Sequence, residues 1–393
     1  MRGLKVSIAL LSSLTLGAGA AVAAGEPIRI GVPTSRTGTY TVLGDQVVRA
    51  IEFAAAEANA AGGIDGRKVE VKIADDEGNP DAGRRAGEKL SLEGYKILTG
   101  SISSAVGLAL STQLNRWDAL YVSVVNKSPR LTGDACHRRM FRANHSDDMD
   151  IAIVTPWLKD KPEQNWSIIA ADYLWGRGSA AAFKEAAQKL GKTIKSELFP
   201  PLGTTDFAPY ITQLRDSGAQ GLWVALSGSD AINFAKQARQ FGLTDKMVVF
   251  GHNFVVPSTV KAVGKDAIGI WGNVGYAPSI ESPRNKAFVE AWRAKYQADP
   301  TDYEGEAYTG SLLIFEAVKR AKSVAPAQVA KAMEGLTLMS PFGEVTMRAA
   351  DHQLEMPNYL GRVVDVNGEA SIEVVREFDA KTATPPPSGE CKL

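Results

Sequence analysis

The sequence has few of the residues on which covalent and metal chemistry depend. It contains two cysteines and four histidines in 393 residues, and no pair of histidines has the spacing of metal ligands: His137, His145, His252 and His352. After residue 24 it has no G-x-S-x-G, Walker, H-E-x-x-H or C-x-x-C motif. We therefore expect no enzyme activity, no cofactor and no metal.

The chain also lacks an excess of charge of either sign. Its 44 basic residues balance 44 acidic ones, so it has no basic surplus for neutralising nucleic-acid phosphates. With 45% hydrophobic and 22% charged residues, the composition is that of a soluble globular protein. At about 150 residues per domain, the length allows two or three folded units.

A long apolar run is missing beyond the N-terminus. Residues 1–24 combine Arg2 and Lys5, an apolar stretch at Val6–Leu16 and small residues ending at Ala24, which is typical of a secretory signal peptide. An uncleaved anchor is the alternative, but this stretch is too short to cross about 30 Å of hydrocarbon. We expect cleavage and a free periplasmic protein with 42 basic and 44 acidic residues, because no cysteine follows the cleavage site to carry a lipid.

Export bears on the cysteine pair, Cys136 and Cys391. An even number of cysteines in an oxidising compartment favours a disulfide, and Cys391 lies two residues from a terminus where it has little to pack against. We predict a Cys136–Cys391 bridge that holds the C-terminal tail against the body of the protein. Two buried thiols are the alternative.

Strand and helix patterns alternate along most of the chain. Ile28–Val32 is typical of a strand and Gly44–Ala61 of a helix, and two more strand–helix units follow before residue 125. A second such series begins near Ser146 and includes a helix over Gly178–Leu190. We predict an α/β fold in which parallel sheets are covered on both faces, with Ala370–Phe378 as a late hairpin strand.

Three local patterns suggest chemistry that we do not expect. Gly176–Ala181 matches a G-x-G-x-x-A nucleotide fingerprint, but four residues separate it from the preceding strand, so we interpret it as a turn that exposes Trp175 to a cleft. Asp75–Glu77 and Asp147–Asp150 group carboxylates that could share a raised pKa. We interpret the first as a solvated turn and the second as the acidic start of a helix.

Short motifs occur in a fixed order along Pro27–Phe378: Ile28–Val32, Thr37–Gly38, Gly44, Ala61–Val69, Asp75–Asp76, Asn79–Pro80, Phe207, Ile211–Leu214 and Phe234–Gly242. Their order and spacing resemble the periplasmic solute-binding proteins of ABC importers, of the branched-chain amino-acid (Leu/Ile/Val) type. The resemblance implies a type I periplasmic binding protein with two Rossmann-like lobes joined by three crossover segments. It also implies a small-molecule ligand, an ABC permease in the inner membrane as partner and, we expect, a monomer.

The expected lobes combine distant parts of the chain. The N-terminal lobe takes residues 25–145 and 277–354, and the C-terminal lobe takes residues 146–276 and 355–393. The ligand would lie between them and hold them closed.

The resemblance also assigns site residues. Ser104 stands where the family places a hydroxyl that holds the ligand carboxylate, and a loop entering a helix presents free N–H groups to an anion. A helix cap at Ser103 or Ser104 is the alternative. Asn126 and Lys127 follow the fourth strand, where amino-acid binders have a small residue and a threonine. Lys127 is either a second anion-binding cation or a solvated rim residue.

The amine side departs further from the family. Asn253 stands where amino-acid binders place a carboxylate for the ligand ammonium, and Trp175 and Ser227 replace two tyrosines. Tyr40 and Tyr303 are weaker candidates for aromatic walls, and ordinary core packing is the alternative for all three aromatic residues. Because a buried unpaired ammonium costs several kcal/mol, the site favours a carboxylate without an amine, such as a benzoate or phenylpropanoid.

The assignment of Asn253 rests on a short motif, so the register is open by one or two residues. In that case Glu304 or Glu306 would receive an ammonium, and the protein would be a branched-chain or other amino-acid receptor. An exported enzyme is the remaining alternative.

Overall fold

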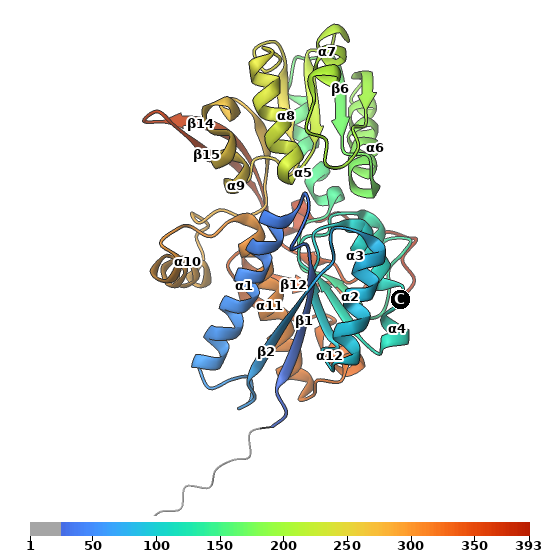
Figure 1. Cartoon of the computed structure of the whole chain (residues 1–393), viewed down its shortest axis with the longest axis vertical. Coiled ribbons are helices and arrows are strands. Elements are labelled where there is room, and N and C mark those ends of the chain that lie inside the picture. The colour runs from blue at the N-terminus through green and yellow to red at the C-terminus, as the bar shows by residue number, and fades with distance from the viewer. Residues whose placement is uncertain (1–24) are drawn as a thin grey trace, which may run out of the picture.

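The computed structural model describes residues 25–393, and the predicted signal peptide lies outside them. The chain forms two α/β lobes, one above the other in Figure 1, each built on its own sheet. Among the described residues, no helix combines the length and the apolar character that a bilayer span requires.

The lower lobe in Figure 1 is built on a five-stranded parallel sheet in the order β2-β1-β3-β4-β5. Its strands are β1 (Ile28–Thr34), β2 (Val69–Asp75), β3 (Ile97–Gly100), β4 (Leu120–Ser123) and β5 (Met140–Arg142). β3 and β4 are buried along their whole length, as parallel strands are when helices cover both faces. The helices of this lobe are α1 (Thr41–Ala60), α2 (Pro80–Leu92), α3 (Ser104–Ser111), α4 (Leu114–Trp117), α11 (Asp302–Ala321) and α12 (Pro326–Met333).

The upper lobe contains a seven-stranded sheet in the order β15-β14-β10-β9-β8-β6-β7. Its strands are β6 (Asn165–Ala170), β7 (Thr193–Leu198), β8 (Gly221–Ala225), β9 (Val248–Gly251), β10 (Trp271–Val274), β14 (Asn358–Val366) and β15 (Glu369–Phe378). The predicted hairpin is confirmed, because β15 pairs with β14 in antiparallel register. The helices of this lobe are α5 (Asp147–Lys159), α6 (Leu174–Lys189), α7 (Ala208–Asp216), α8 (Gly228–Gln240) and α9 (Pro257–Val263).

The chain passes between the lobes three times. It leaves the first sheet after β5, returns between β10 and α11, and crosses again just before β14. The returning part also carries α10 (Pro283–Tyr296) and a small antiparallel sheet of β11 (Thr337–Ser340), β12 (Gly343–Met347) and β13 (Leu354–Glu355). The exact lobe boundaries given above stay a prediction.

The C-terminal tail connects the lobes a fourth time. After β15, α13 (Ala380–Ala383) contacts α5, and the tail then returns to the lower lobe, where the C-terminus lies in Figure 1. Cys391 forms a disulfide with Cys136, with 5.5 Å between their Cα atoms, which confirms the predicted pairing. The end of the predicted C-terminal lobe thus contacts both lobes.

The glycines around Trp175 have a different role from the predicted one. α6 begins at Leu174, so Trp175 lies in the first turn of a helix and not in a loop. A Cβ on Gly176 would lie 2.0 Å from the carbonyl oxygen of Ala171, so a glycine is needed there for close packing between strand and helix. The helix start was missed because glycines lower helix propensity.

Candidate functional site

A small cavity lies between the lobes. Its lining residues follow the carboxyl ends of β3, β4, β6, β8 and β9 or begin α11: Ile102, Ser104, Val125, Lys127, Tyr173, Trp175, Ser227, Asn253 and Tyr303. Ligands of open parallel α/β sheets bind at this edge of the strands. Both lobes therefore contribute to one binding site.

Ser104 presents a hydrogen-bond donor to this cavity. Its Oγ accepts the backbone N–H groups of Lys127 and Ser128, both at 3.2 Å. With both lone pairs used, the hydroxyl hydrogen is left for a group in the cavity. Ser103 is the N-cap residue of α3, and its side chain accepts no capping hydrogen bond within the described chain.

Lys127 is a buried cation rather than a solvated rim residue. Its Nζ lies 2.7 Å from Oδ2 of Asp150, and the two side chains are 4% and 0% exposed. Burial lowers the pKa of Lys127, but the carboxylates of Asp150 and Glu306 more than offset this, so the net shift is upward. Because Lys127 belongs to the lower lobe and Asp150 to the upper, this ion pair joins the lobes beside the cavity, which Lys127 lines.

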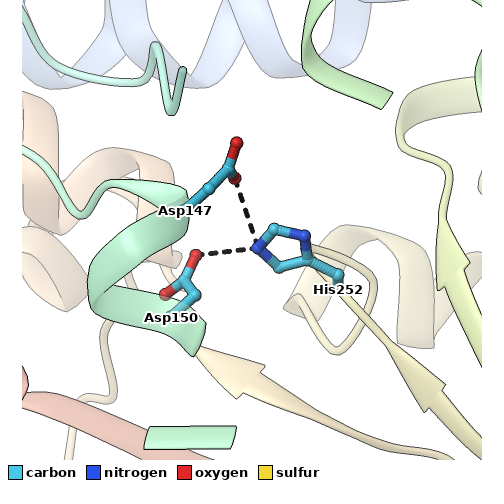
Figure 2. Close-up of side chains that lie close together, drawn as sticks. All are labelled: Asp147, Asp150 and His252. Carbon is cyan, nitrogen blue, oxygen red and sulfur yellow. Dashed lines mark hydrogen bonds and ion pairs between the residues drawn. The ribbon is translucent and has the colours of Figure 1, made fainter. Parts of the chain in front are cut away.

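Asp150 is the centre of a larger buried network. Its Oδ2 also lies within hydrogen-bonding distance of Nε2 of His252, at 2.9 Å. Its Oδ1 accepts a hydrogen bond from the side-chain amide of Asn358, also at 2.9 Å. Asp147, one turn earlier on α5, has its Oδ1 3.5 Å from the same His252 nitrogen (Figure 2). Oδ1 of Asp147 also accepts the indole N–H of Trp175 at 2.9 Å. The network therefore connects the buried charges to an aromatic residue of the cavity wall.

The tautomer of His252 follows from its neighbours. The indole N–H of Trp223 donates to Oγ of Ser179 at 3.0 Å, and that Oγ lies 2.7 Å from Nδ1 of His252. The Ser179 hydroxyl then donates to Nδ1, which leaves the ring proton on Nε2 to donate to Asp150. This assignment needs a neutral imidazole, and burial holds the pKa of His252 below its ordinary value.

The carboxyl groups of Asp147 and Asp150 have pKa shifts of opposite direction. Lys127 and His252 outweigh the effect of burial and hold the pKa of Asp150 below its ordinary range. Burial and the neighbouring Asp150 carboxylate raise the pKa of Asp147 well above its ordinary value. Oδ2 of Asp147 has no hydrogen-bond partner among the described residues. The Asp147–Asp150 segment begins a helix as predicted, but these two side chains are buried.

Asp147, Asp150 and His252 bring one possible metal-ligand atom each to within 4.8 Å of one another. The ammonium of Lys127 already contacts the Asp150 oxygen that a metal would need. A second cation there would be repelled by Lys127 at short range and in a buried setting. The residues present therefore fit an ion-pair network better than a metal site.

The three acidic residues at the start of α11 do not belong to the described lining of the cavity. Among the described residues that line it, none is aspartate or glutamate. Glu304 accepts Nε of Arg49 at 2.7 Å, and Oε1 of Glu306 lies 2.7 Å from Nδ1 of His145. Asp302 is buried at the start of α11, where burial and the Glu306 carboxylate raise its pKa to about 8. Each lies outside the cavity lining.

The sequence matches the periplasmic binding protein family over residues 27–369. The chain belongs to the periplasmic binding protein family. A curated relative, Leu/Ile/Val-binding protein homolog 8 of Brucella suis, is 28% identical over 86% of this chain and 87% of its own length. The resemblance inferred from the motifs is confirmed.

Solved structures show the same fold. A solute-binding protein of an ABC transporter from Rhodopseudomonas palustris, in complex with 3,4-dihydroxybenzoic acid, has a TM-score of 0.83 and 23% identity over 90% of this chain and 98% of its own. Another from the same species, in complex with benzoate, has a TM-score of 0.84 and 19% identity over 93% and 100%. These structures show the fold of this periplasmic binding protein, and the family that its sequence matches is one of binding proteins rather than enzymes.

The predicted site residues of this periplasmic binding protein divide into two groups. The residues that line the cavity are Ser104, Lys127, Trp175, Ser227, Asn253 and Tyr303. Asn126 lies behind the wall, where its amide donates to the carbonyls of Ser101 and Ile102. Tyr40 is buried against Tyr173, with 6.3 Å between ring centroids. Their ligand-binding roles stay predictions.

Sequence reasoning missed three lining residues and also the burial of an acid in the first acidic cluster. Ile102, Val125 and Tyr173 line the cavity, and each lies within two residues of a position that the sequence did single out. Proximity to those positions was the available signal. Asp76, predicted to lie in a solvated turn, is buried and accepts the hydroxyl of Ser35 at 2.7 Å.

Proposed function

We propose that this periplasmic substrate-binding protein captures a small carboxylate without an amine, specifically an aromatic acid of the benzoate or phenylpropanoid type. The proposal rests on one observation: the described lining of the cavity includes the cation Lys127 and no acid. A carboxylate would meet Lys127 and the Ser104 hydroxyl. An α-ammonium would be desolvated without a counter-charge, which costs several kcal/mol.

The walls of the cavity suit a flat ring. Tyr173 and Trp175 from the upper lobe and Tyr303 from the lower lobe face the same space, and aromatic side chains of this kind each offer about 150–250 Å² of surface. The neutral polar side chains of Ser227 and Asn253 would fix ring substituents by hydrogen bonds.

Binding would act through closure of the lobes. A ligand that contacts Ser104 and Trp175 together does so only when the lobes are closed, so it stabilises the closed form by its differential affinity. The loaded protein then delivers its ligand to the permease. We propose that it acts as a monomer in the periplasm after removal of residues 1–24.

The ligands of related structures agree with this proposal. Solute-binding proteins of the same fold from Rhodopseudomonas palustris hold 3,4-dihydroxybenzoic acid and benzoate. Their sequence identity to this chain is 23% and 19%, so the argument for this protein depends on its own cavity.

A thermal-shift screen tests the proposal, because a ligand that binds the folded form raises its melting temperature. Benzoate, 4-hydroxybenzoate and 3-phenylpropanoate are compared with acetate, L-leucine and L-phenylalanine. We expect the aromatic acids to raise Tm and the amino acids to leave it unchanged. Stabilisation by L-leucine without stabilisation by any aromatic acid would refute the proposal.

An amino-acid ligand is the second candidate. The curated relatives are homologues of Leu/Ile/Val-binding proteins, and Oδ2 of Asp147 has no hydrogen-bond partner in the described chain. An ammonium that reached past Trp175 could pair with that oxygen. The amino acids in the same screen decide between the two candidates.

A further inference from the structure

The lobes also meet at a second place, away from the cavity lining. The backbone carbonyl of Thr39, in the loop between β1 and α1, accepts the backbone N–H of Ser229 at 3.4 Å. Ser229 lies in the first turn of α8 in the other lobe. Thr39, Gly228 and Ser229 do not belong to the described lining of the cavity. We call this contact, formed by residues 38–40 and 228–229, the rim contact.

The lower-lobe side of the rim contact is held rigidly by the first acidic cluster. Asp75 accepts the backbone N–H of Arg36 at 2.9 Å and the hydroxyl of Thr37 at 2.8 Å. Asp76 accepts the hydroxyl of Ser35 at 2.7 Å. These bonds fix the loop that leads to Thr39, so the carbonyl is presented in a defined direction.

The upper-lobe side requires a glycine. Gly228 has a φ of +61°, and a Cβ placed on it would lie 2.4 Å from the carbonyl oxygen of Thr39. This distance is too short for a non-bonded carbon–oxygen contact. The oxygen belongs to the backbone of Thr39, which cannot easily move aside. Close approach of the lobes at this point therefore depends on the missing side chain of Gly228.

We propose that the rim contact stabilises the closed form of the protein without touching the ligand, and that Gly228 is a positioning residue for closure. A side chain at position 228 would be tolerated in the open form, where Thr39 is distant. In the closed form it would hold the lobes apart. Closure, and with it ligand retention, would then weaken although every residue of the cavity is unchanged.

The chain offers a matched control for Gly228→Ala. Gly218 has a φ of +74°, and a Cβ there would meet no atom within 4 Å. Alanine at either position bears the same backbone penalty for a positive φ. Gly228→Ala and Gly218→Ala should therefore lose similar thermal stability, and only the first should affect closure.

The ligand-free readout is deuterium uptake of peptides that cover residues 36–41, which lie in the lobe opposite the substitution. We expect uptake in Gly228→Ala to be at least twofold faster than in wild type and in Gly218→Ala. A purely local effect of the substitution on α8 would not change exchange across the cleft. Equal uptake in all three proteins would overturn the inference.

A binding readout uses benzoate, 3-phenylpropanoate and L-leucine as probes, so it works whether an acid or an amino acid is the ligand. For the probe that binds wild type, we expect at least tenfold weaker binding by Gly228→Ala, mainly through faster dissociation, and unchanged binding by Gly218→Ala. Equal affinities would contradict the rim contact. Failure of all probes would count against the proposed function alone, and exchange would still decide closure.

A second variant tests the rim contact if Gly228→Ala fails to fold. Ser229→Pro removes the N–H that donates to Thr39, at a position in the first turn of α8 where proline is tolerated. We expect the same direction of change in exchange at residues 36–41, with a smaller size. A variant that folds and exchanges like wild type would contradict the proposal.

Discussion

The two walls of the cavity differ in charge. The lower lobe supplies Ser104 and the buried cation Lys127, whereas the upper lobe supplies Trp175, Ser227 and Asn253, none of which is charged. One wall is therefore suited to an anion, and the other has neutral hydrogen-bonding groups beside an aromatic ring. Selectivity against amino acids would therefore come from the absence of an acidic side chain in the upper wall.

The buried charged residues near these walls explain why the upper wall offers no carboxylate to a ligand ammonium. Asp150 is close enough to attract an ammonium, but Lys127 and His252 already occupy its Oδ2. Burial and the Asp150 carboxylate raise the pKa of Asp147, whose Oδ2 has no hydrogen-bond partner among the described residues. The described lining of the upper wall has no charged side chain, although Asp147 accepts a hydrogen bond from Trp175 of that wall.

Removal of the cation from the lower wall should have the largest effect. Lys127→Met leaves the Asp150 carboxylate buried without its ion partner, and we expect a loss of about 3–5 kcal/mol in the free energy of unfolding. Urea denaturation measures it. The double variant Lys127→Met with Asp150→Asn should recover part of the loss. A loss below about 1 kcal/mol in the single variant would contradict a charged, buried pair.

Removal of the aromatic ring of Trp175 from the upper wall should have the second largest effect. Trp175→Ala is expected to weaken 3-phenylpropanoate binding by about 2–4 kcal/mol through lost ring contacts, with little effect on acetate. Trp175→Phe keeps a ring and loses the N–H that donates to Asp147, so it should retain most of the affinity. Calorimetry gives both values. Equal losses for the two ligands would point to damage of the fold.

Ser104→Ala tests the anion-binding wall by a substitution with a smaller expected effect on affinity. Loss of a hydroxyl that donates to a buried carboxylate should weaken binding by about 1–3 kcal/mol. Ser103→Ala is the control, because Ser103 is next in the chain but outside the described cavity lining. Matching affinities for wild type and Ser104→Ala would remove Ser104 from the ligand site.

The last prediction concerns pH and Asp302. Burial raises the pKa of this carboxyl group to about 8, so between its ordinary value and about 8 the folded protein holds a proton that the unfolded chain releases. The free energy of unfolding should therefore fall as pH rises from 6 to 8. Asp302→Asn should flatten that slope in thermal melts. An unchanged slope would mean that Asp302 is ionised in the folded protein.

Much of the fold could be predicted because it depends on local pattern. Buried parallel strands such as β4 and β8 are short continuous apolar runs, and helices with one apolar face separate them. The cysteine pairing could also be predicted, because an exported chain with two cysteines favours a disulfide between them. The start of α6 could not be predicted, because Gly176 is chosen for its contact with Ala171 and the same residue type also marks turns.

The site was predicted less completely, because its burial depends on partners distant in the chain. Asp76 accepts a hydrogen bond from Ser35, which lies 41 residues earlier in the chain. Asp150 contacts His252, which lies 102 residues later. Without those partners an acidic cluster is expected to be solvated. The resemblance to known proteins supplied Ser104 and Trp175, but it gave no sign that Lys127 would be paired across the lobes.

We propose that the cavity binds a carboxylate and excludes an α-ammonium. Calorimetric titration with 3-phenylpropanoate and L-phenylalanine separates these two properties, since the two ligands differ by that amine alone. We predict that wild type binds the acid at least tenfold more tightly, and that Asn253→Asp, which adds a carboxylate to the upper wall, reduces or reverses the preference. Tighter binding of L-phenylalanine by wild type would contradict the account.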